Sequence, residues 1–194
     1  MPHPNNHSSV RNVNTPKYWD ERYADTATYP AVSMGDGLRK QLLGNMIRKG
    51  ASVLDIGCGS GDLLHYLVSY QINDKIYGCD ITPVGIDNAR LRLPTGEFYV
   101  IPTFAAPIPF QDMDYVIVSH VAEHIEEPEK YLKFWMQAVK PVTGKMIILI
   151  PLEDDPYVEH LKVWNLQDMD DLAKKISNNY MITTHYQGWN YDSD

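Results

Sequence analysis

Hydrophobic residues follow two different spacings along this chain, and the two spacings alternate. Short apolar runs are typical of buried strands, whereas apolar residues that recur every three or four positions are typical of helices with one buried face. The short runs predict strands at 52–56, 75–81, 97–101, 114–119, 145–150 and 180–189. The wider spacing predicts helices at 16–24, about 35–49, about 61–70, 83 to about 91, from 128 onward, and from the residue after Asn165 to about 176.

Three of these helices begin at a recognisable signal. Thr82 precedes Pro83, and we expect the threonine side chain to accept a hydrogen bond from a free amide of the first turn, where proline needs no partner. Pro128 and Asn165 predict two further helix starts.

The order of these elements predicts the fold. Strands that are apolar throughout and alternate with one-faced helices indicate a parallel sheet covered on both faces. We therefore predict an α/β fold, doubly wound and Rossmann-like, in which the carboxyl ends of the strands share one edge and ligands bind there. Residues 1–14 are polar and are predicted to be a disordered leader, and residues 15–194 to form a single domain.

Composition narrows the partners. The chain has 194 residues and a formal net charge of -8, which disfavours nucleic acid, because proteins that bind its backbone present basic surfaces. A small-molecule or glycan partner fits better. The longest apolar run, 146–150, is too short to cross a bilayer, and the amino terminus lacks a signal-peptide core, so we predict a cytoplasmic protein with no membrane partner. Cys58 and Cys79 have no disulfide-framework or zinc spacing and are expected to be reduced thiols.

The stretch "VLDIGCGSGD" at 53–62 places three glycines, Gly57, Gly59 and Gly61, between a strand and a helix. Glycine permits positive φ and lets a ligand approach the main chain, and a helix amino terminus favours an anionic group. Asp55 precedes the turn and Asp80 ends the next strand, where a carboxylate can accept both hydroxyls of a ribose. A dinucleotide oxidoreductase would share this acid, but its third glycine comes one residue later.

Four stretches together resemble the class I S-adenosylmethionine-dependent methyltransferases, of the group called methyltransferase type 11 or 25. They are "YWDERY" at 18–23, "VLDIGCGSGD", "IYGCDIT" at 76–82 and "DYVIVSHVAEHIEEP" at 114–128. The resemblance implies S-adenosylmethionine as cofactor, S-adenosylhomocysteine as product, and the first helix as a lid, although its aromatic residues suit ordinary packing equally well. It implies that the cofactor contacts Tyr18, Asp55, Gly57, Cys58, Gly59, Gly61, Asp80, Ile81 and Ser119.

The chain departs from this family pattern in two places. Many relatives have an acid after the third strand that reads the adenine amino group, but the matching positions here are Thr103 and Phe104. We expect Phe104 to pack against adenine instead. The chain also stops soon after the last predicted strand, so the final antiparallel strand of the family is expected to be missing or supplied by a partner, which leaves a monomer or a homodimer open.

The expected reaction is methyl transfer by in-line displacement to a hydroxyl or amine of a small molecule or sugar. Histidine is the usual base for such acceptors, and His120 and His124 follow the fourth strand. His120 is the favoured base; His124 either shares the role or braces the turn, and His160 is a third possibility. The acidic loop at 153–160 is interpreted as a surface that selects the acceptor, and no metal site is predicted. The alternative function is a catalytically idle cofactor-binding module that acts as an assembly partner.

Overall fold

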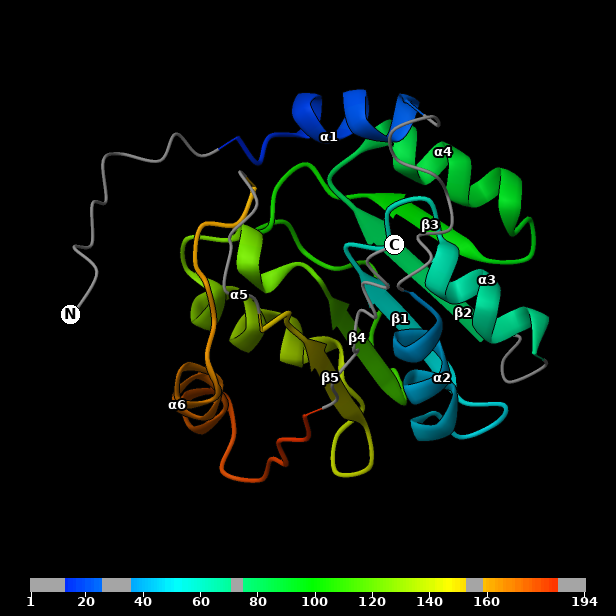
Figure 1. The fold of residues 1–194 in the computed structure, drawn as a ribbon. Helices are drawn as coiled ribbons and strands as arrows, with labels where there is room; N and C mark the ends of the chain where they lie inside the picture. The colour runs from blue at the N-terminus through cyan, green and yellow to red at the C-terminus, as the bar shows by residue number, and fades with distance from the viewer. Residues whose placement is uncertain (1–12, 26–35, 71–74, 153–158, 185–194) are drawn as a thin grey trace, which may run out of the picture.

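The strands of this protein form one parallel sheet (Figure 1). The structure, a computed structural model, describes residues 13–25, 36–70, 75–152 and 159–184. Within these ranges the sheet has the order β3-β2-β1-β4-β5. The strands are β1 (Ser52–Ile56), β2 (Lys75–Asp80), β3 (Glu97–Val100), β4 (Tyr115–Ser119) and β5 (Lys145–Leu149). The predicted Rossmann-like α/β fold is confirmed, and the strand order reverses between β1 and β4, which is where such sheets bind ligands.

Helices cover both faces of the sheet. One face carries α2 (Asp36–Met46), α3 (Asp62–Ser69) and α4 (Pro83–Arg92). The other carries α5 (Pro128–Trp135), the short 3-10 helix η2 (Met136–Ala138) and α6 (Leu166–Ile176). The helix α1 (Pro16–Ala24) lies beside α4 at the carboxyl edge of the sheet, and the 3-10 turn η1 (Ala122–His124) follows β4 (Figure 1).

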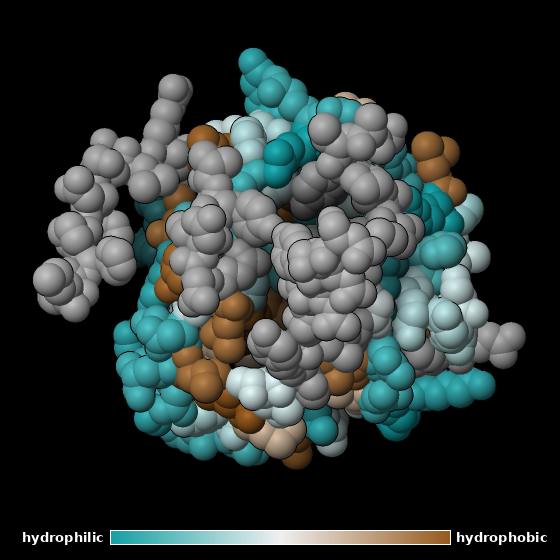
Figure 2. Space-filling model, viewed as in Figure 1, coloured by the Kyte–Doolittle hydropathy of each residue, from teal (hydrophilic) through white to brown (hydrophobic). Residues whose placement is uncertain are grey.

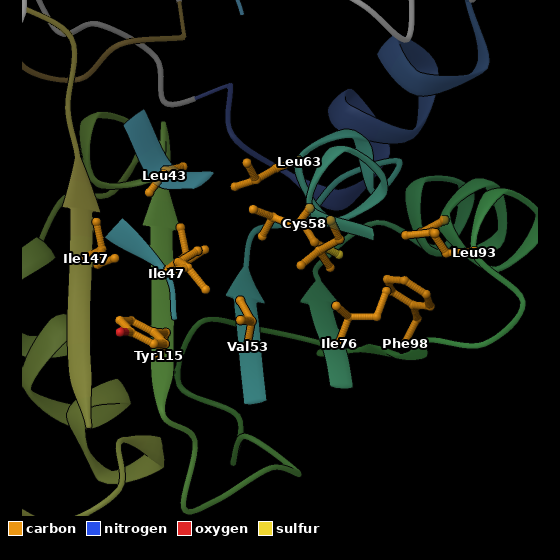
Figure 3. Packing of buried hydrophobic residues seen from close by; sticks show 14 of the residues in the cluster. Leu43, Ile47, Val53, Cys58, Leu63, Ile76, Leu93, Phe98, Tyr115 and Ile147 are labelled. Carbon is orange, nitrogen blue, oxygen red and sulfur yellow. The ribbon is translucent and has the colours of Figure 1, made fainter. Parts of the chain in front are cut away.

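Alternate residues of each strand supply the two halves of the core, because successive side chains of a strand point to opposite faces. Figure 3 shows the half under α2, α3 and α4. Its members include Leu43, Ile47, Val53, Leu63, Ile76, Leu93, Phe98, Tyr115 and Ile147. In the other half, Leu54 and Ile56 of β1 face Leu132 and the fully buried Trp135 of α5. The sheet is therefore held from both sides, and its carboxyl edge is a rigid base for the loops that follow.

The predicted start of α4 was half right. Pro83 does open the helix, but the Thr82 side chain makes no cap and instead donates to the Asp80 carboxylate over 3.0 Å. The free amide of Val84 donates to Oδ1 of Asp20, on α1, over 3.0 Å. The cap of α4 thus comes from a helix about 60 residues earlier in the chain, which local sequence patterns cannot reveal. By contrast, the Asn165 cap of α6 is confirmed, with a capping box closed by Asp168.

The last predicted strand was wrong where the structure tests it. Residues 180–184 have no regular secondary structure, and 185–189 lie outside the described residues, as do residues 1–12 of the predicted leader.

In Figure 2 hydrophobic side chains gather over the region of α5 and α6, while much of the rim is hydrophilic. None of the helices in the described ranges combines the length and apolar character needed to span a membrane.

Candidate functional site

The glycine turn after β1 has the backbone conformation that the sequence predicts. The φ angles of Gly57, Gly59 and Gly61 are 80°, 51° and 75°, a region that other residues rarely adopt. The space around Gly57 and Gly59 is also too small for a side chain. A Cβ atom on Gly57 would lie 2.3 Å from a methyl carbon of Val121, and one on Gly59 would lie 2.4 Å from the Tyr23 hydroxyl. The turn therefore requires glycine for its conformation and for the close approach of Val121, which follows β4, and of α1.

Asp80 fixes the shape of this turn from the neighbouring strand. Its carboxylate accepts hydrogen bonds from the amide of Gly59 over 2.8 Å and from the amide and hydroxyl of Thr82 over 3.0 Å each. The side chain is almost fully buried, and burial raises its pKa although these hydrogen bonds oppose the shift. The amide of Ile81 also lowers the pKa of this carboxylate as a hydrogen-bond donor, so the turn takes up all of its roughly four lone-pair sites. A hydroxyl of a ligand would have to share an oxygen of Asp80 with one of these donors.

Most of the other predicted cofactor residues lie at the same edge of the sheet. Asp55, Cys58, Ile81 and Ser119 are all buried there, at or just after the carboxyl ends of β1, β2 and β4. Cys58 is a free cysteine, and burial raises the pKa of its thiol above the usual value. The edge thus offers an apolar wall with a few carboxylate and hydroxyl groups, the mixture expected of a small-molecule pocket.

Two predicted cofactor residues, Phe104 and Tyr18, contact α5 and Glu159 respectively. The ring of Phe104 packs against Tyr131 and Trp135 of α5, with centroids 6.0 Å apart in both cases. The hydroxyl of Tyr18 donates to the Glu159 carboxylate over 2.7 Å. Within α1 it is Tyr23, rather than Tyr18, whose hydroxyl lies against the glycine turn.

His120 begins a turn that we call the histidine turn, residues 120–124. Its φ angle is 56°, unusual for a residue other than glycine, and its amide donates to Leu149 of β5 over 3.0 Å. The imidazole is 45% exposed, and Nδ1 lies 3.3 Å from Oε1 of Glu123. Glu123 itself is fully buried. Strained backbone beside a buried charge often marks a functional site, and here it presents an imidazole to the edge where ligands bind.

His124 is the inner member of the histidine turn. Its Nδ1 lies 3.0 Å from the main-chain oxygen of Glu159, and Trp19 of α1 packs edge-on at 5.0 Å between centroids. Burial lowers the pKa of His124, although the nearby Glu123 opposes the shift. These contacts suit the bracing role that was one of the two predictions for this residue. His160 lies next to it, with ring centroids 5.0 Å apart.

Glu159 connects its own segment to α1, to Asn14 and to His124. The sequence analysis did not single it out as a site residue. Its carboxylate accepts from Tyr18 and pairs with Arg22, both on α1, and its main-chain oxygen receives Nδ2 of Asn14 over 2.9 Å. Burial raises its pKa, but the hydrogen bond from Tyr18 and the charge of Arg22 outweigh this and hold the pKa below the usual value. The sequence shows Glu159 only as one acid of an acidic loop, whose residues 153–158 lie outside the described residues.

Comparison with known proteins identifies the family. The methyltransferase domain family matches residues 30–189. The chain belongs to this family. The resemblance to class I S-adenosylmethionine-dependent methyltransferases, read from four short stretches, is thereby confirmed.

Specific relatives of this methyltransferase have diverse acceptors. A tRNA N(3)-methylcytidine methyltransferase of Schizosaccharomyces pombe is 39% identical over 51 residues, which are 26% of this chain and 21% of the relative. The ribosomal protein L11 methyltransferase of Paraburkholderia xenovorans is 30% identical over 113 residues, 47% of this chain and 37% of the relative. The matched part is therefore well under half the length of either relative.

A solved structure matches more of the chain. The TehB-like SAM-dependent methyltransferase from Corynebacterium glutamicum superposes with a TM-score of 0.60 at 22% identity, covering 83% of this chain and 82% of that one. At this level of identity the match shows that the two proteins share a fold.

Proposed function

We propose that this methyltransferase transfers the methyl group of S-adenosylmethionine to a hydroxyl or amine of a small molecule or sugar. The observation that carries the proposal is the contact between Gly57 and Val121, because it joins the glycine turn directly to the histidine turn. A cofactor held by the first would have its reactive end beside the second. We also propose a cytoplasmic location and either a monomer or a homodimer.

The glycine turn and its neighbours fit the predicted cofactor. The buried Asp80 carboxylate would accept a ribose hydroxyl at an oxygen that it shares with a donor of the turn, and Asp55 lies buried one strand away, where a carboxylate would attract an ammonium group. Ile81 offers an apolar surface next to Asp80. When bound, S-adenosylmethionine supplies a sulfonium methyl group that an acceptor attacks in line. The protein must then align the acceptor and exclude water.

His120 would accept the proton of the acceptor. Glu123 Oε1 lies 3.3 Å from its Nδ1, which favours a proton on that nitrogen and leaves Nε2 as the basic atom. The exposed imidazole can reach a bound acceptor, and the buried carboxylate would stabilise the charge that the ring gains. The hydrogen bond between the His120 amide and Leu149 keeps the backbone in place while the ring acts.

The net charge of the chain, -8, favours a small acceptor over nucleic acid. The acids that directly follow the histidine turn add little to this, because Glu127 is paired with Lys130, and Glu129 with Lys133 and Lys175. An acidic protein repels a phosphate backbone. Two of the relatives named above modify tRNA and a ribosomal protein, so these acceptors belong in any test.

Titration of the full chain with S-adenosylhomocysteine tests the cofactor half of the proposal. We expect saturable binding by calorimetry, and we expect Asp80→Ala to weaken it by about 1 to 3 kcal/mol, because ribose hydrogen bonds and the shape of the turn are lost. Asp87→Ala, an exposed acid on α4, is the matched control and should bind normally. A folded Asp80→Ala variant with unchanged affinity would remove Asp80 from the cofactor site.

Turnover is tested with methyl-labelled S-adenosylmethionine and a panel of polyols, sugars, small amines, tRNA and ribosomal protein, with products identified by mass spectrometry. Methylation of a small hydroxyl or amine compound supports the proposal. Methylation of RNA or protein alone would overturn the acceptor class. Tight cofactor binding without any product would favour the idle assembly module.

A further inference from the structure

Three side chains of the histidine turn and its neighbouring segment bring metal-ligating atoms together. Glu123, His124 and His160 each offer one such atom, and all three atoms lie within 4.8 Å of one another. The ligand atoms around a four-coordinate zinc ion, with bonds of about 2.0 to 2.1 Å, stand roughly 3.4 Å apart. Small side-chain movements would therefore close this cluster around an ion.

The buried charge of Glu123 is the first reason to expect a cation here. The side chain is completely buried, and neither carboxylate oxygen receives a hydrogen bond from the part of the chain that the structure describes. Oε1 faces Nδ1 of His120 at 3.3 Å and Nε2 of His124 at 4.0 Å. A buried carboxylate without donors is costly unless it is paired with a cation or a metal, so the position of Glu123 calls for a positive partner.

His124 is oriented as a ligand. Its Nδ1 lies 3.0 Å from the main-chain oxygen of Glu159, which fixes the proton on Nδ1 and leaves the lone pair of Nε2 directed toward Glu123. Ligating histidines in metal sites are commonly held in this way by a carbonyl oxygen. Trp19 packs against the imidazole from the α1 side and limits its rotation.

His160 is held in place by bonds on both sides of it in the chain. The residue before it, Glu159, accepts from His124 through its main chain and from α1 through its carboxylate. The residue after it, Leu161, donates its amide to the main-chain oxygen of Glu123 over 2.8 Å. These bonds fasten segment 159–161 along η1 and place the His160 side chain next to Glu123 and His124.

We propose that Glu123, His124 and His160 bind one divalent transition metal ion, for which Zn²⁺ is the representative. Two imidazoles and one carboxylate are the ligands of catalytic zinc sites, which keep a further position open for water or substrate. Imidazole nitrogen also suits zinc better than magnesium, which prefers oxygen ligands. The sequence did not predict this metal site, because its ligands come from η1 and from segment 159–161, which only the fold brings together.

The position of the ion suggests what it would do, and this step rests on the proposed function. The cluster adjoins His120, so an oxygen of the acceptor could occupy the open position. The ion would lower the pKa of that hydroxyl, and its proton would pass to Nε2 of the adjoining His120. The oxygen then forms a bond to the methyl carbon as the carbon–sulfur bond breaks, and the sulfonium becomes a neutral thioether. The site therefore favours a hydroxyl acceptor over an amine.

Binding of the metal alone tests the site without any methyl transfer. Chelator-treated full chain is titrated with Co²⁺, followed by its visible absorption bands, and with Zn²⁺ by calorimetry. We expect one ion per chain at this site, and at least tenfold weaker binding in Glu123→Gln and in His160→Ala. His65→Ala, an exposed histidine on α3, is the matched control, and His3→Ala with His7→Ala removes binding by the amino-terminal histidines. Both control variants should bind the ion as tightly as the wild type does.

The outcomes separate the metal proposal from the proposed function. Thermal unfolding first tests whether Glu123→Gln is folded. If it is not, His160→Ala serves as the second variant, because His160 is partly exposed. Equal affinity of wild type and His160→Ala, or no tight ion in the wild type, would overturn the site. Normal S-adenosylhomocysteine binding in that case would leave the methyltransferase function standing. Tight Zn²⁺ without S-adenosylhomocysteine binding would support the site and count against the proposed function.

Discussion

The glycine turn and the histidine turn meet at one edge of the sheet but are built in opposite ways. Residues 57–61 act through main chain, lie together in the sequence, and are fixed by one carboxylate, that of Asp80. Residues 120–124 act through side chains and depend on α1 and on segment 159–161, both distant in sequence. The part that would hold the cofactor is formed by neighbouring residues of the sequence, whereas the part that would hold the acceptor is assembled from distant segments.

The largest expected effect comes from removing the exposed imidazole of the histidine turn. We expect His120→Asn to slow methyl transfer by about 10² to 10⁴-fold, the range for loss of a general base, once an acceptor is known. Asparagine tolerates the left-handed backbone found here, so folding should be preserved. Affinity for S-adenosylhomocysteine, measured by calorimetry, should stay within about threefold of wild type, because a base contributes little to cofactor binding.

His65→Ala serves as the control for the loss of a histidine far from this edge. If His120→Asn keeps the full rate, the histidine turn has no part in proton transfer and the contrast between the two turns is structural only.

A smaller effect is expected from adding one carbon to the glycine turn. Gly57→Ala places a Cβ atom 2.3 Å from Val121 and keeps a φ of 80°. We expect a loss of about 2 to 4 kcal/mol in the free energy of unfolding, from overpacking and from the left-handed conformation together. Urea unfolding followed by circular dichroism measures it.

The double variant Gly57→Ala with Val121→Ala separates the two causes. Removing the Val121 methyl groups should restore the steric part, about 1 to 3 kcal/mol, but not the part due to φ. Equal stability of Gly57→Ala and wild type would show that the two turns are not in contact.

The smallest effect is expected at the opposite edge of the sheet, which serves as a reference for both turns. Asp114 accepts from the amide of Ser52 over 3.0 Å and lies near Lys140 and Arg48. The Ser52 amide, with these cations, holds the pKa of Asp114 below its usual value. We expect Asp114→Asn to cost about 0.5 to 1.5 kcal/mol of unfolding free energy at pH 7.

The pH dependence of this effect has a definite sign. A lowered folded-state pKa contributes stability above the unfolded value of about 3.9, and that stability is lost as the pH falls through the folded pKa. The difference between Asp114→Asn and wild type should therefore shrink and vanish as the pH falls through and below the folded pKa, with S-adenosylhomocysteine binding at pH 7 unchanged. A difference that persists in acid would mean that packing, and not charge, stabilises this edge.

Sequence patterns predicted what depends on local order. The strand at 52–56 was predicted to the residue, and the positive φ angles of its glycine turn follow from residue type alone. The Thr82 cap failed because a carboxylate two residues away competes for the hydroxyl. The strand predicted from residue 180 failed over 180–184, because an apolar run gives no sign of whether a neighbouring strand is in reach to pair with it.

The position of His160 beside His124 lay beyond such prediction for a related reason. It depends on a hydrogen bond between an imidazole and a main-chain oxygen 35 positions away, which leaves no pattern in the sequence. "AEHI" shortly after an apolar strand was the available signal, since it contains the acid Glu123, which is buried in the turn.

The Asp20 cap has a consequence for where this domain can be cut. The family match begins at residue 30, and a shortened chain that starts there would keep the whole matched region but lose "YWDERY" at 18–23. It would also leave the first turn of α4 with an unbonded amide at Val84 and would strip Glu159 of Tyr18 and Arg22. An expressed domain should therefore begin before Asn14, because the folded unit begins earlier in the chain than the region that matches the family.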